Sequence, residues 1–243
     1  SSENMSVRFP AVLLICAAVS AGDWPTYQHD SLRSGKTDER LETVGLGAVW
    51  TYRSSLPPQP AWPGPARWDA YARIRGLRSL RNYDPVFHTA IARGRVYFSS
   101  NADDSVYCLD AKTGTVEWSF CTDGPVRSAP TVSGEKVYFG SDDGNAYCLS
   151  AESGKLIWSF NPNPDHRLVI HNGRLISFWP CRTGVAVRDG TAYFGHSLLP
   201  WKESYLCAVN AETGKPDGDG RYVQRLKSQT MEGAILASGQ RLV

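Results

Sequence analysis

The sequence predicts an all-β protein assembled from a recurring unit of four antiparallel strands, and three observations support this prediction. Residues 96–120 (VYFSSNADDSVYCLDAKTGTVEWSF) and 137–160 (VYFGSDDGNAYCLSAESGKLIWSF) are near copies of each other. Apolar and polar residues alternate strictly in VEWSF, at 116–120, as in a strand and unlike a helix. Finally, 8 Trp and 11 Tyr accompany 22 Gly and 15 Pro, a composition typical of short strands joined by tight turns.

The spacing of the copies indicates what the unit is. Tyr97 and Tyr138 lie 41 positions apart, and Trp118 and Trp158 lie 40 positions apart. A period of about 40 residues is typical of propeller blades, four-stranded units that bury their faces only by stacking on neighbours. A third copy, at 192–215, is stretched by the insertion SLLPWKE. The sequence therefore predicts a β-propeller of four-stranded antiparallel blades.

Alternation and turn residues place the strands of one unit in order. The first strand is expected at 126–132 and the second at 136–141, followed by the tight turn Asp-Asp-Gly. The third strand is expected at 146–149. After a Ser-Gly turn, the fourth follows at 156–160, where Trp158 shares one face with the apolar residues two positions before and after it.

The propeller is expected to be incomplete. About three full blades are predicted, at about 86–120, 126–160 and 184–227. Parts of two flanking blades are also predicted: an outer strand at 49–53 and the start of another blade at 233–243. Closed propellers typically have about 4 to 8 blades. The ring over 49–243 is therefore expected to stay open unless further blades are supplied.

The first 21 residues are expected to be a secretory signal peptide. The stretch from Met5 to Ala21 has one Arg, a short apolar run and small residues at its end. A buried strand or helix is the alternative. The apolar run is too short to cross a bilayer, which takes ~20 apolar residues. We therefore expect an exported protein, periplasmic or extracellular, without a transmembrane segment, in which residues 22–48 form an N-terminal segment before the propeller.

The repeats carry a motif that resembles the tryptophan-docking motif of PQQ-like (quinoprotein-type) β-propeller repeat proteins. The copies are LDAKTGTVEW and LSAESGKLIW, and the opening DWPTYQHDSLRSG also resembles the start of bacterial members of this family. The resemblance implies that Trp118 and Trp158 wedge between adjacent blades, and that Gly114 and Gly154 supply the turns. The third copy departs from the motif, because Pro216 and a DGDG run stand where the strand and its tryptophan should follow.

Three insertions are expected on one rim of the propeller, at 54–85, 161–183 and 197–203. Two lie between the fourth strand of one blade and the first strand of the next, and the third lies between a second and a third strand. In an antiparallel blade these connections emerge on the same side. Loops on a rigid scaffold commonly carry binding groups, so this rim is expected to bind a protein or small ligand through Trp62, Trp68, Tyr71, Arg75, Arg78, Trp179, Arg182 and Trp201. The alternative is that the aromatic residues pack the loops and the arginines pair with carboxylates.

Charge and motifs argue against several classes of function. The 26 basic and 24 acidic residues leave a net charge of +2, which is much lower than the strong positive charge typical of a nucleic-acid-binding protein. No paired cysteines or close histidine pair support zinc, and neither a GxSxG motif nor a Walker loop is present. The DGDG run lacks the Glu that would complete a calcium-binding loop. A disulfide between Cys121 and Cys181 is one possibility in an oxidising compartment, but the spacing of the cysteines does not establish it.

Two functions from different classes remain. The first is a non-catalytic binding or scaffolding module of the cell envelope, without a cofactor and similar in fold to the outer-membrane assembly component BamB. The second is a PQQ-dependent alcohol or sugar dehydrogenase, in which a calcium-bound quinone oxidises the substrate and an Asp acts as base. Many such enzymes have a vicinal cysteine pair, which this sequence lacks. No residue matches the catalytic Asp or the calcium ligands, so the scaffold is favoured and the dehydrogenase is the alternative.

Overall fold

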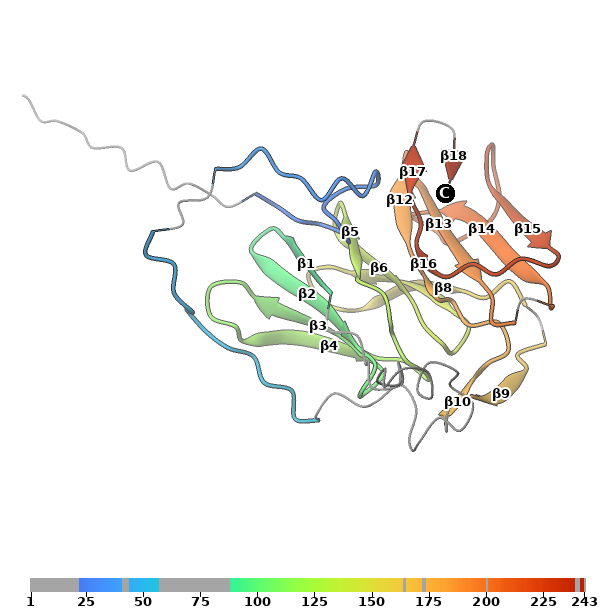
Figure 1. Ribbon diagram of the computed structural model, residues 1–243, viewed down its shortest axis with the longest axis horizontal. Coiled ribbons are helices and arrows are strands. Elements are labelled where there is room, and N and C mark those ends of the chain that lie inside the picture. Colours follow the sequence, from blue (N-terminus) through green and yellow to red (C-terminus); the bar gives the residue numbers. More distant parts are fainter. Residues whose placement is uncertain are drawn as a thin grey trace, which may run out of the picture.

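The computed structural model describes residues 22–40, 44–56, 88–163, 165–171, 174–199, 201–238 and 241–242. The regular structure in these residues consists of strands, most of which belong to three four-stranded antiparallel sheets that follow one another along the chain (Figure 1). In this part of the chain, no helix has the length and apolar character needed to cross a bilayer.

Each sheet is one blade, and its strands lie in sequence order. The first blade contains β1 (Thr89–Ala92), β2 (Arg95–Ser100), β3 (Ser105–Asp110) and β4 (Val116–Cys121). The second contains β5 (Thr131–Ser133), β6 (Lys136–Gly140), β7 (Ala146–Ser150) and β8 (Leu156–Phe160). The third contains β12 (Ala186–Arg188), β13 (Thr191–His196), β14 (Ser204–Asn210) and β15 (Tyr222–Leu226). The predicted all-β fold of four-stranded blades is confirmed.

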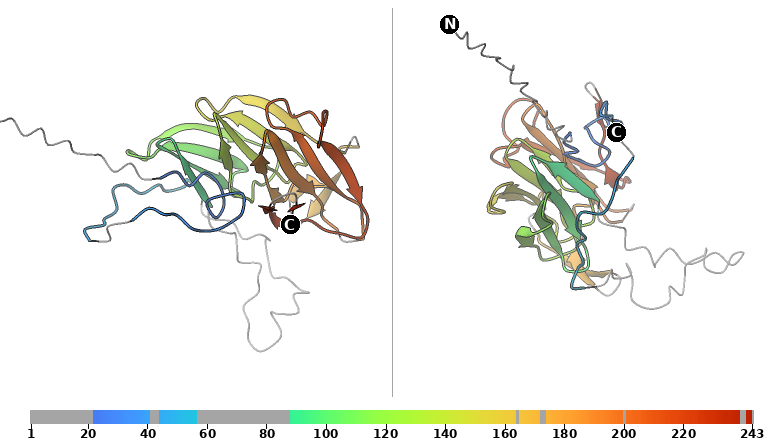
Figure 2. Two further views of the ribbon diagram at one scale, coloured as in Figure 1. Left: turned by 90° about the horizontal axis from the view of Figure 1, so that it is seen from above. Right: turned by 90° about the vertical axis from the view of Figure 1, so that its left-hand side faces the viewer.

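The blades fan out side by side from their first strands (Figure 2). β1 contacts β5, and β5 contacts β12. The fourth strands, β4, β8 and β15, form the opposite edge of each sheet. The inner side of the array therefore lies where each blade begins.

Shorter pairs complete the structure. β9 (Leu168–His171) and β10 (Arg174–Ser177) form an antiparallel hairpin inside the 161–183 insertion, which the sequence did not predict. β11 (Thr183–Gly184) pairs in parallel with β16 (Gly233–Ala234). β17 (Ala237–Ser238) and β18 (Arg241–Leu242) form a two-stranded antiparallel pair within the region where a further blade was expected to begin.

Two expected strands differ in the structure. The first strand of the second blade begins at Thr131 instead of 126, because Pro130 has no N–H to donate to a ladder. Residues 49–53, expected as an outer strand, pair with no strand in the described part of the chain. Without an adjacent strand edge, their backbone groups have no ladder to join.

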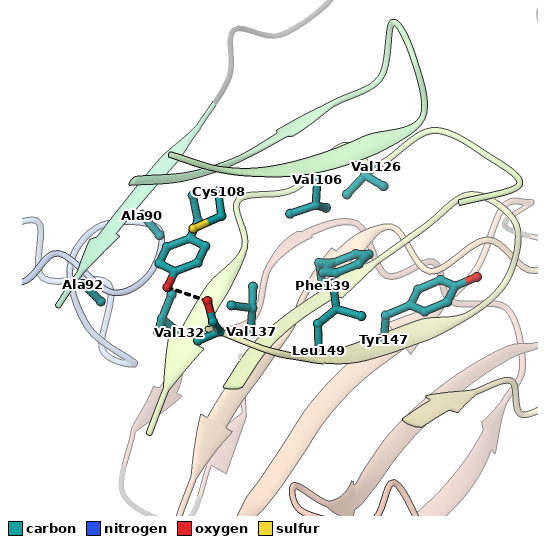
Figure 3. Close-up of a cluster of buried hydrophobic side chains, with 12 residues drawn as sticks. Ala90, Ala92, Val106, Cys108, Val126, Val132, Val137, Phe139, Tyr147 and Leu149 are labelled. Atoms are coloured by element: carbon teal, nitrogen blue, oxygen red, sulfur yellow. Dashed lines mark hydrogen bonds between the residues drawn. The ribbon is translucent and has the colours of Figure 1, made fainter. Parts of the chain in front are cut away.

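A core of buried side chains fills the space between the first two blades (Figure 3). Val106 and Cys108 of the first blade face Phe139 and Leu149 of the second, and all four are fully buried. A hydrogen bond joins the same two blades, because the Tyr97 hydroxyl donates to the carbonyl of Ala151 at 3.3 Å. Tyr138 makes the matching bond to Ala211 in the third blade, at 3.2 Å. The blades are therefore packed by a repeated set of contacts.

Three tryptophans make equivalent contacts with the next blade along the chain. The indole N–H groups of Trp50, Trp118 and Trp158 donate to backbone carbonyls at 3.0, 3.1 and 2.9 Å, those of Ala111, Ala151 and Ala211. Each ring also covers a glycine: a Cβ atom would lie 2.5 Å from Trp50 at Gly114, 2.7 Å from Trp118 at Gly154, and 2.6 Å from Trp158 at Gly214. Trp50 and Gly214 were not among the predicted docking residues. That these contacts hold the blades together remains a prediction.

The third blade lacks this tryptophan. Trp118 and Trp158 stand opposite Cys108 and Cys148 in their sheets, and Val223 stands opposite the equivalent Cys207. Val223 is 40% exposed. The departure seen in the third sequence copy therefore replaces an indole with a small side chain at the outer edge of this blade.

The N-terminal segment crosses the inner side of the array (blue in Figure 1). Trp24 forms an isolated bridge with Ile91 of β1. The carbonyl of Pro25 accepts a hydrogen bond from Val132 of β5 at 2.7 Å, and the carbonyl of Ser31 accepts one from Ala237 of β17 at 2.9 Å. Residues 24–31 thus connect three first-strand regions that are far apart in the sequence.

Candidate functional site

Two cavities flank the 161–183 insertion. The inner cavity, of about 380 Å³, lies at the starts of the blades and is bordered by the N-terminal segment. The rim groove, of about 480 Å³, lies between the 161–183 and 197–203 insertions and the end of β15. The same insertion therefore borders both cavities.

Positively charged side chains line the inner cavity. Arg127 and Arg182 come from equivalent positions, just before the first strands of the second and third blades, and Arg33 comes from the N-terminal segment. Arg33 donates to the Thr26 hydroxyl at 2.7 Å and to the carbonyl of Ile235 at 3.0 Å. The Thr26 hydroxyl is 2.8 Å from that of Thr131, which donates to the carbonyl of Val185. This network fixes the wall formed by the N-terminal segment.

Asp142 is held between two of these arginines. Its side chain is 1% exposed and lies in the turn between β6 and β7. Arg127 Nε donates to one carboxylate oxygen at 2.8 Å, and Arg182 donates to both oxygens at 3.1 Å. Arg182 also lies 3.8 Å from Glu232. Both oxygens of this buried carboxylate are therefore already hydrogen-bonded.

The histidines at the inner cavity differ in environment. His171 comes from β9, and burial, followed by the charge of Arg182, lowers its pKa. Its ring is therefore favoured in the neutral form near pH 7. His88 stacks edge-on against Tyr27, with ring centroids 5.1 Å apart.

The described residues do not fit a calcium-bound quinone. Calcium takes about six to eight oxygen ligands, whereas Glu232, the acidic residue that lines the inner cavity, lies near Arg182, and Asp142 is paired with two of the lining arginines. Within the described ranges, no group of three or more His, Cys, Asp or Glu side chains is placed to hold a metal ion. The charged side chains that line this cavity are mostly arginines, and their positive charge disfavours binding of a divalent cation.

Aromatic side chains form the floor of the rim groove. Phe178 and Trp179 are buried and meet edge-on, with ring centroids 4.7 Å apart. The indole N–H of Trp179 donates to the carbonyl of Glu203 at 2.9 Å, which joins the two insertions. Arg167 lies over the Phe178 ring, 4.6 Å from its centroid. The floor is therefore already packed and hydrogen-bonded.

The walls of the rim groove carry an exposed indole and several cations. Trp201 is 71% exposed. Arg167, Lys202 and Lys227 also line the groove, and among the described residues none of them has a carboxylate within ion-pairing distance. Glu203 is paired with Arg225, whose hydrogen bond lowers the pKa of Glu203. Arg167, Lys202 and Lys227 therefore outnumber Glu203, the one acidic residue that lines the groove.

The structure separates the predicted rim residues into two places. Trp179 and Trp201 line the rim groove, whereas Arg182 lines the inner cavity and pairs with Asp142. The remaining candidates lie outside the described residues: Trp62, Trp68, Tyr71, Arg75 and Arg78. Sequence reasoning missed Arg127 and Asp142, although the equivalent positions of Arg127 and Arg182 in the repeats were a usable signal.

The five cysteines in the described ranges are all free thiols. The pairing considered for Cys121 and Cys181 is therefore absent, because Cys181 is buried while Cys121 is exposed on the edge strand β4. Burial raises the pKa of Cys108 and Cys148 to about 12, and also raises the pKa of Cys181 and Cys207. These four thiols lack the thiolate character that nucleophilic or redox chemistry requires.

Comparison with solved structures shows the fold. A quinohemoprotein alcohol dehydrogenase from Comamonas testosteroni is 19% identical with a TM-score of 0.58, over 84% of this chain and 27% of that protein. One from Pseudomonas putida is 24% identical with a TM-score of 0.44, over 52% of this chain and 19% of that protein. BamB from Moraxella catarrhalis is 17% identical with a TM-score of 0.39, over 54% of this chain and 33% of that protein. The chain thus spans a third or less of the length of each.

A search of curated protein sequences finds no match to this chain. A family model described as outer membrane protein assembly factor BamB matches residues 64–240, more than two thirds of the sequence. The match agrees with the repeat motif, the four-stranded blades and the recurring indole contacts. The chain therefore belongs to this BamB family of PQQ-like β-propeller repeats.

Proposed function

We propose that this chain is part of an exported β-propeller that acts as a non-catalytic binding or scaffolding module of the cell envelope. Its binding surface is the rim formed by the 161–183 and 197–203 insertions. The observation that carries this proposal is Asp142: both oxygens of this buried carboxylate accept hydrogen bonds from arginines.

A dehydrogenase of the quinone-dependent class needs a carboxylate that can take a proton from the substrate. Asp142 instead has a side chain that is 1% exposed, and both of its oxygens accept hydrogen bonds from guanidinium groups, so its carboxylate is not presented to a substrate. Glu232 lies near Arg182 and is exposed. The surroundings of Asp142 and Glu232 therefore support a structural role for these two residues better than general-base catalysis.

The rim groove supports the binding role. Its aromatic floor is fixed by the hydrogen bond from Trp179 to Glu203, so little ordering is needed when a partner binds. The exposed Trp201 is of a residue type enriched at the energetic centres of protein interfaces. A binding surface of this kind requires no reactive group.

The alternative is a PQQ-dependent dehydrogenase, which the structural similarity to a quinohemoprotein alcohol dehydrogenase keeps open. To distinguish the two, the full-length protein is titrated with PQQ and Ca²⁺, and alcohol-dependent dye reduction is measured. We expect neither saturable quinone binding nor turnover. Saturable binding accompanied by turnover would overturn the scaffold proposal.

Export is tested separately by fractionation of cells that produce the tagged full-length protein. We expect it in the periplasmic or extracellular fraction, with the first 21 residues removed. Recovery of an uncleaved chain in the cytosol would contradict export, whatever the outcome of the quinone titration.

A further inference from the structure

The β9–β10 hairpin (Figure 1) carries three exposed aliphatic side chains on one face. Leu168, Ile170 and Leu175 are 53%, 77% and 57% exposed. Ile170 pairs directly with Leu175, and Leu168 lies two positions before Ile170 on β9, so the three side chains share one face. Arg167, at the edge of the groove, directly precedes Leu168 in the chain. The groove and the hairpin are therefore adjacent at the junction of Arg167 and Leu168 in the chain.

The surface combines three kinds of recognition chemistry. The exposed Trp201 offers a large flat ring, and the hairpin offers aliphatic side chains. Arg167, Lys202 and Lys227 supply positive charge, and Glu203 is already paired with Arg225. Exposed apolar groups rimmed by polar residues mark interaction sites, and uncompensated cations favour an anionic partner.

We propose that the rim groove and the adjoining hairpin face bind an extended protein segment in which acidic and apolar residues alternate. This inference rests on the proposed scaffold function and names the partner of its rim. In an extended chain, alternate side chains point to opposite sides. The apolar side chains would lie on Trp201 and the hairpin, while the carboxylates reach Arg167 and the two lysines.

The shape of the site favours a peptide over other anionic partners. A groove of about 480 Å³ with a packed aromatic floor accepts side chains, whereas a lipid surface remains outside a concavity. Nucleic acid is disfavoured because the net charge of the whole chain is only +2. Each strand of the two-stranded hairpin also has an edge without a partner strand among the described residues. Such an edge suits main-chain pairing with an extended segment.

The test uses the full-length protein and a short fluorescein-labelled peptide of alternating Glu and Phe, followed by fluorescence anisotropy. The control peptide carries Lys in place of each Glu. We expect saturable binding of the acidic peptide that weakens as salt is raised, and at least about tenfold weaker binding of the basic peptide. Equal affinity for the two peptides overturns the proposal.

Variants locate the site. Trp201→Ala and the double variant Lys202→Glu with Lys227→Glu are each expected to weaken acidic-peptide binding by about tenfold or more. The matched control is Lys112→Glu with Lys155→Glu, which makes the same charge change at two exposed lysines in the turns between third and fourth strands. This control should bind within about twofold of the wild type. If it loses as much affinity as the rim variant, the effect is non-specific and the proposal is wrong.

Two further arms separate this inference from other anionic partners. Anionic phosphatidylglycerol vesicles and single-stranded DNA are tested with the same variants. Tighter capture of either one than of the acidic peptide, abolished by Trp201→Ala, would assign the surface to that partner and overturn the peptide proposal. The quinone titration and the dye assay test the scaffold function, whereas peptide binding tests this inference. A protein that shows no turnover and binds no acidic peptide would therefore contradict this inference and leave the scaffold function intact.

Discussion

At Trp118, one side chain contacts two blades at once. The residue belongs to β4 of the first blade, while its indole N–H donates to Ala151 in the second blade and its ring covers Gly154. An aromatic ring in this position contributes through burial and through one directed hydrogen bond. Trp201, by comparison, is mostly in water.

The substitution Trp118→Ala is expected to lower the free energy of unfolding by about 3–5 kcal/mol, the usual cost of deleting a packed aromatic side chain. Trp201→Ala, the matched control, should change it by less than about 0.5 kcal/mol because its indole is exposed. Urea-induced unfolding followed by circular dichroism measures both. An unchanged midpoint for Trp118→Ala would mean that the indole does not hold the blades together.

His196 is a buried group whose protonation opposes folding. Its side chain is fully buried at the end of β13, and Nε2 has no hydrogen-bond partner among the described residues. Nδ1 lies 3.4 Å from the carbonyl of Trp179. Burial lowers the pKa of His196 to about 3. The native state therefore keeps this ring neutral, whereas an unfolded chain protonates it below about pH 6.5.

Between about pH 6.5 and pH 3 the unfolded state binds one proton more than the native state at this site. The contribution of His196 to stability is therefore intact above about pH 6.5, and falls by about 1.4 kcal/mol per pH unit as the pH drops through this range. His196→Gln should flatten the pH dependence by that slope, measured by urea unfolding at pH 7, 6 and 5. Other groups titrate equally in both proteins, so identical slopes would show that His196 is accessible to protons in the native state.

The turn between the third and fourth strands of each blade brings a backbone glycine against a tryptophan ring that precedes the blade in the chain. Gly154 has a φ of +67°, and a Cβ there would lie 2.7 Å from the Trp118 ring. Gly134, in the turn between β5 and β6, has a similar φ of +59° and open space around it. The two glycines therefore share the backbone requirement and differ in the indole contact.

We expect Gly154→Ala to be more destabilising than Gly134→Ala by about 1–3 kcal/mol, because the added methyl group displaces the Trp118 ring in addition to straining the backbone. Thermal unfolding of the two variants gives the comparison. Equal losses would indicate that the positive φ alone accounts for the glycine, and that the ring moves aside freely.

The elements that the sequence predicts correctly are those with local signals. The strands β6, β7 and β8 were expected within a residue of their observed ends, because alternation and turn residues act over a few positions. The β9–β10 hairpin and the parallel pair of β11 with β16 were not expected. β16 lies about 50 residues after β11, and no local pattern encodes such a pairing.

The same contrast between local signals and long-range contacts explains which residues of the candidate site the sequence could predict. Trp201 was identified because an insertion interrupts the repeat, and the structure leaves it exposed. Asp142 looked like an ordinary turn residue, since its pairing with Arg127 and Arg182 depends on how two blades meet. Sequence reasoning placed Arg182 on the rim, but only the structure shows that it faces the inner cavity.

At the scale of the whole molecule, Arg33 joins the N-terminal segment to the region of β16 and β17. Its guanidinium donates to Thr26, to the carbonyl of Tyr27 and to the carbonyl of Ile235. Arg33→Ala should release this segment from the inner side of the array. The exchange of the amide hydrogens of Val132 and Ala237, which donate to Pro25 and Ser31, is then expected to accelerate in parallel.

Hydrogen exchange followed by mass spectrometry measures this effect. The amide of Phe139, in the middle of β6, serves as the internal control because its ladder does not involve the N-terminal segment. Faster exchange at Ala237 alone would mean that Arg33 stabilises only the contact between Ser31 and Ala237, and not the whole N-terminal segment.

The N-terminal segment also changes how the protein should respond to force. In repeat arrays each unit touches only its neighbours, so units detach one after another from an end. Here residues 24–31 bind β1, β5 and β17, which spans non-adjacent blades. Pulling on the ends should therefore give a first, larger rupture when this tether yields, and the blades should detach one after another only after it.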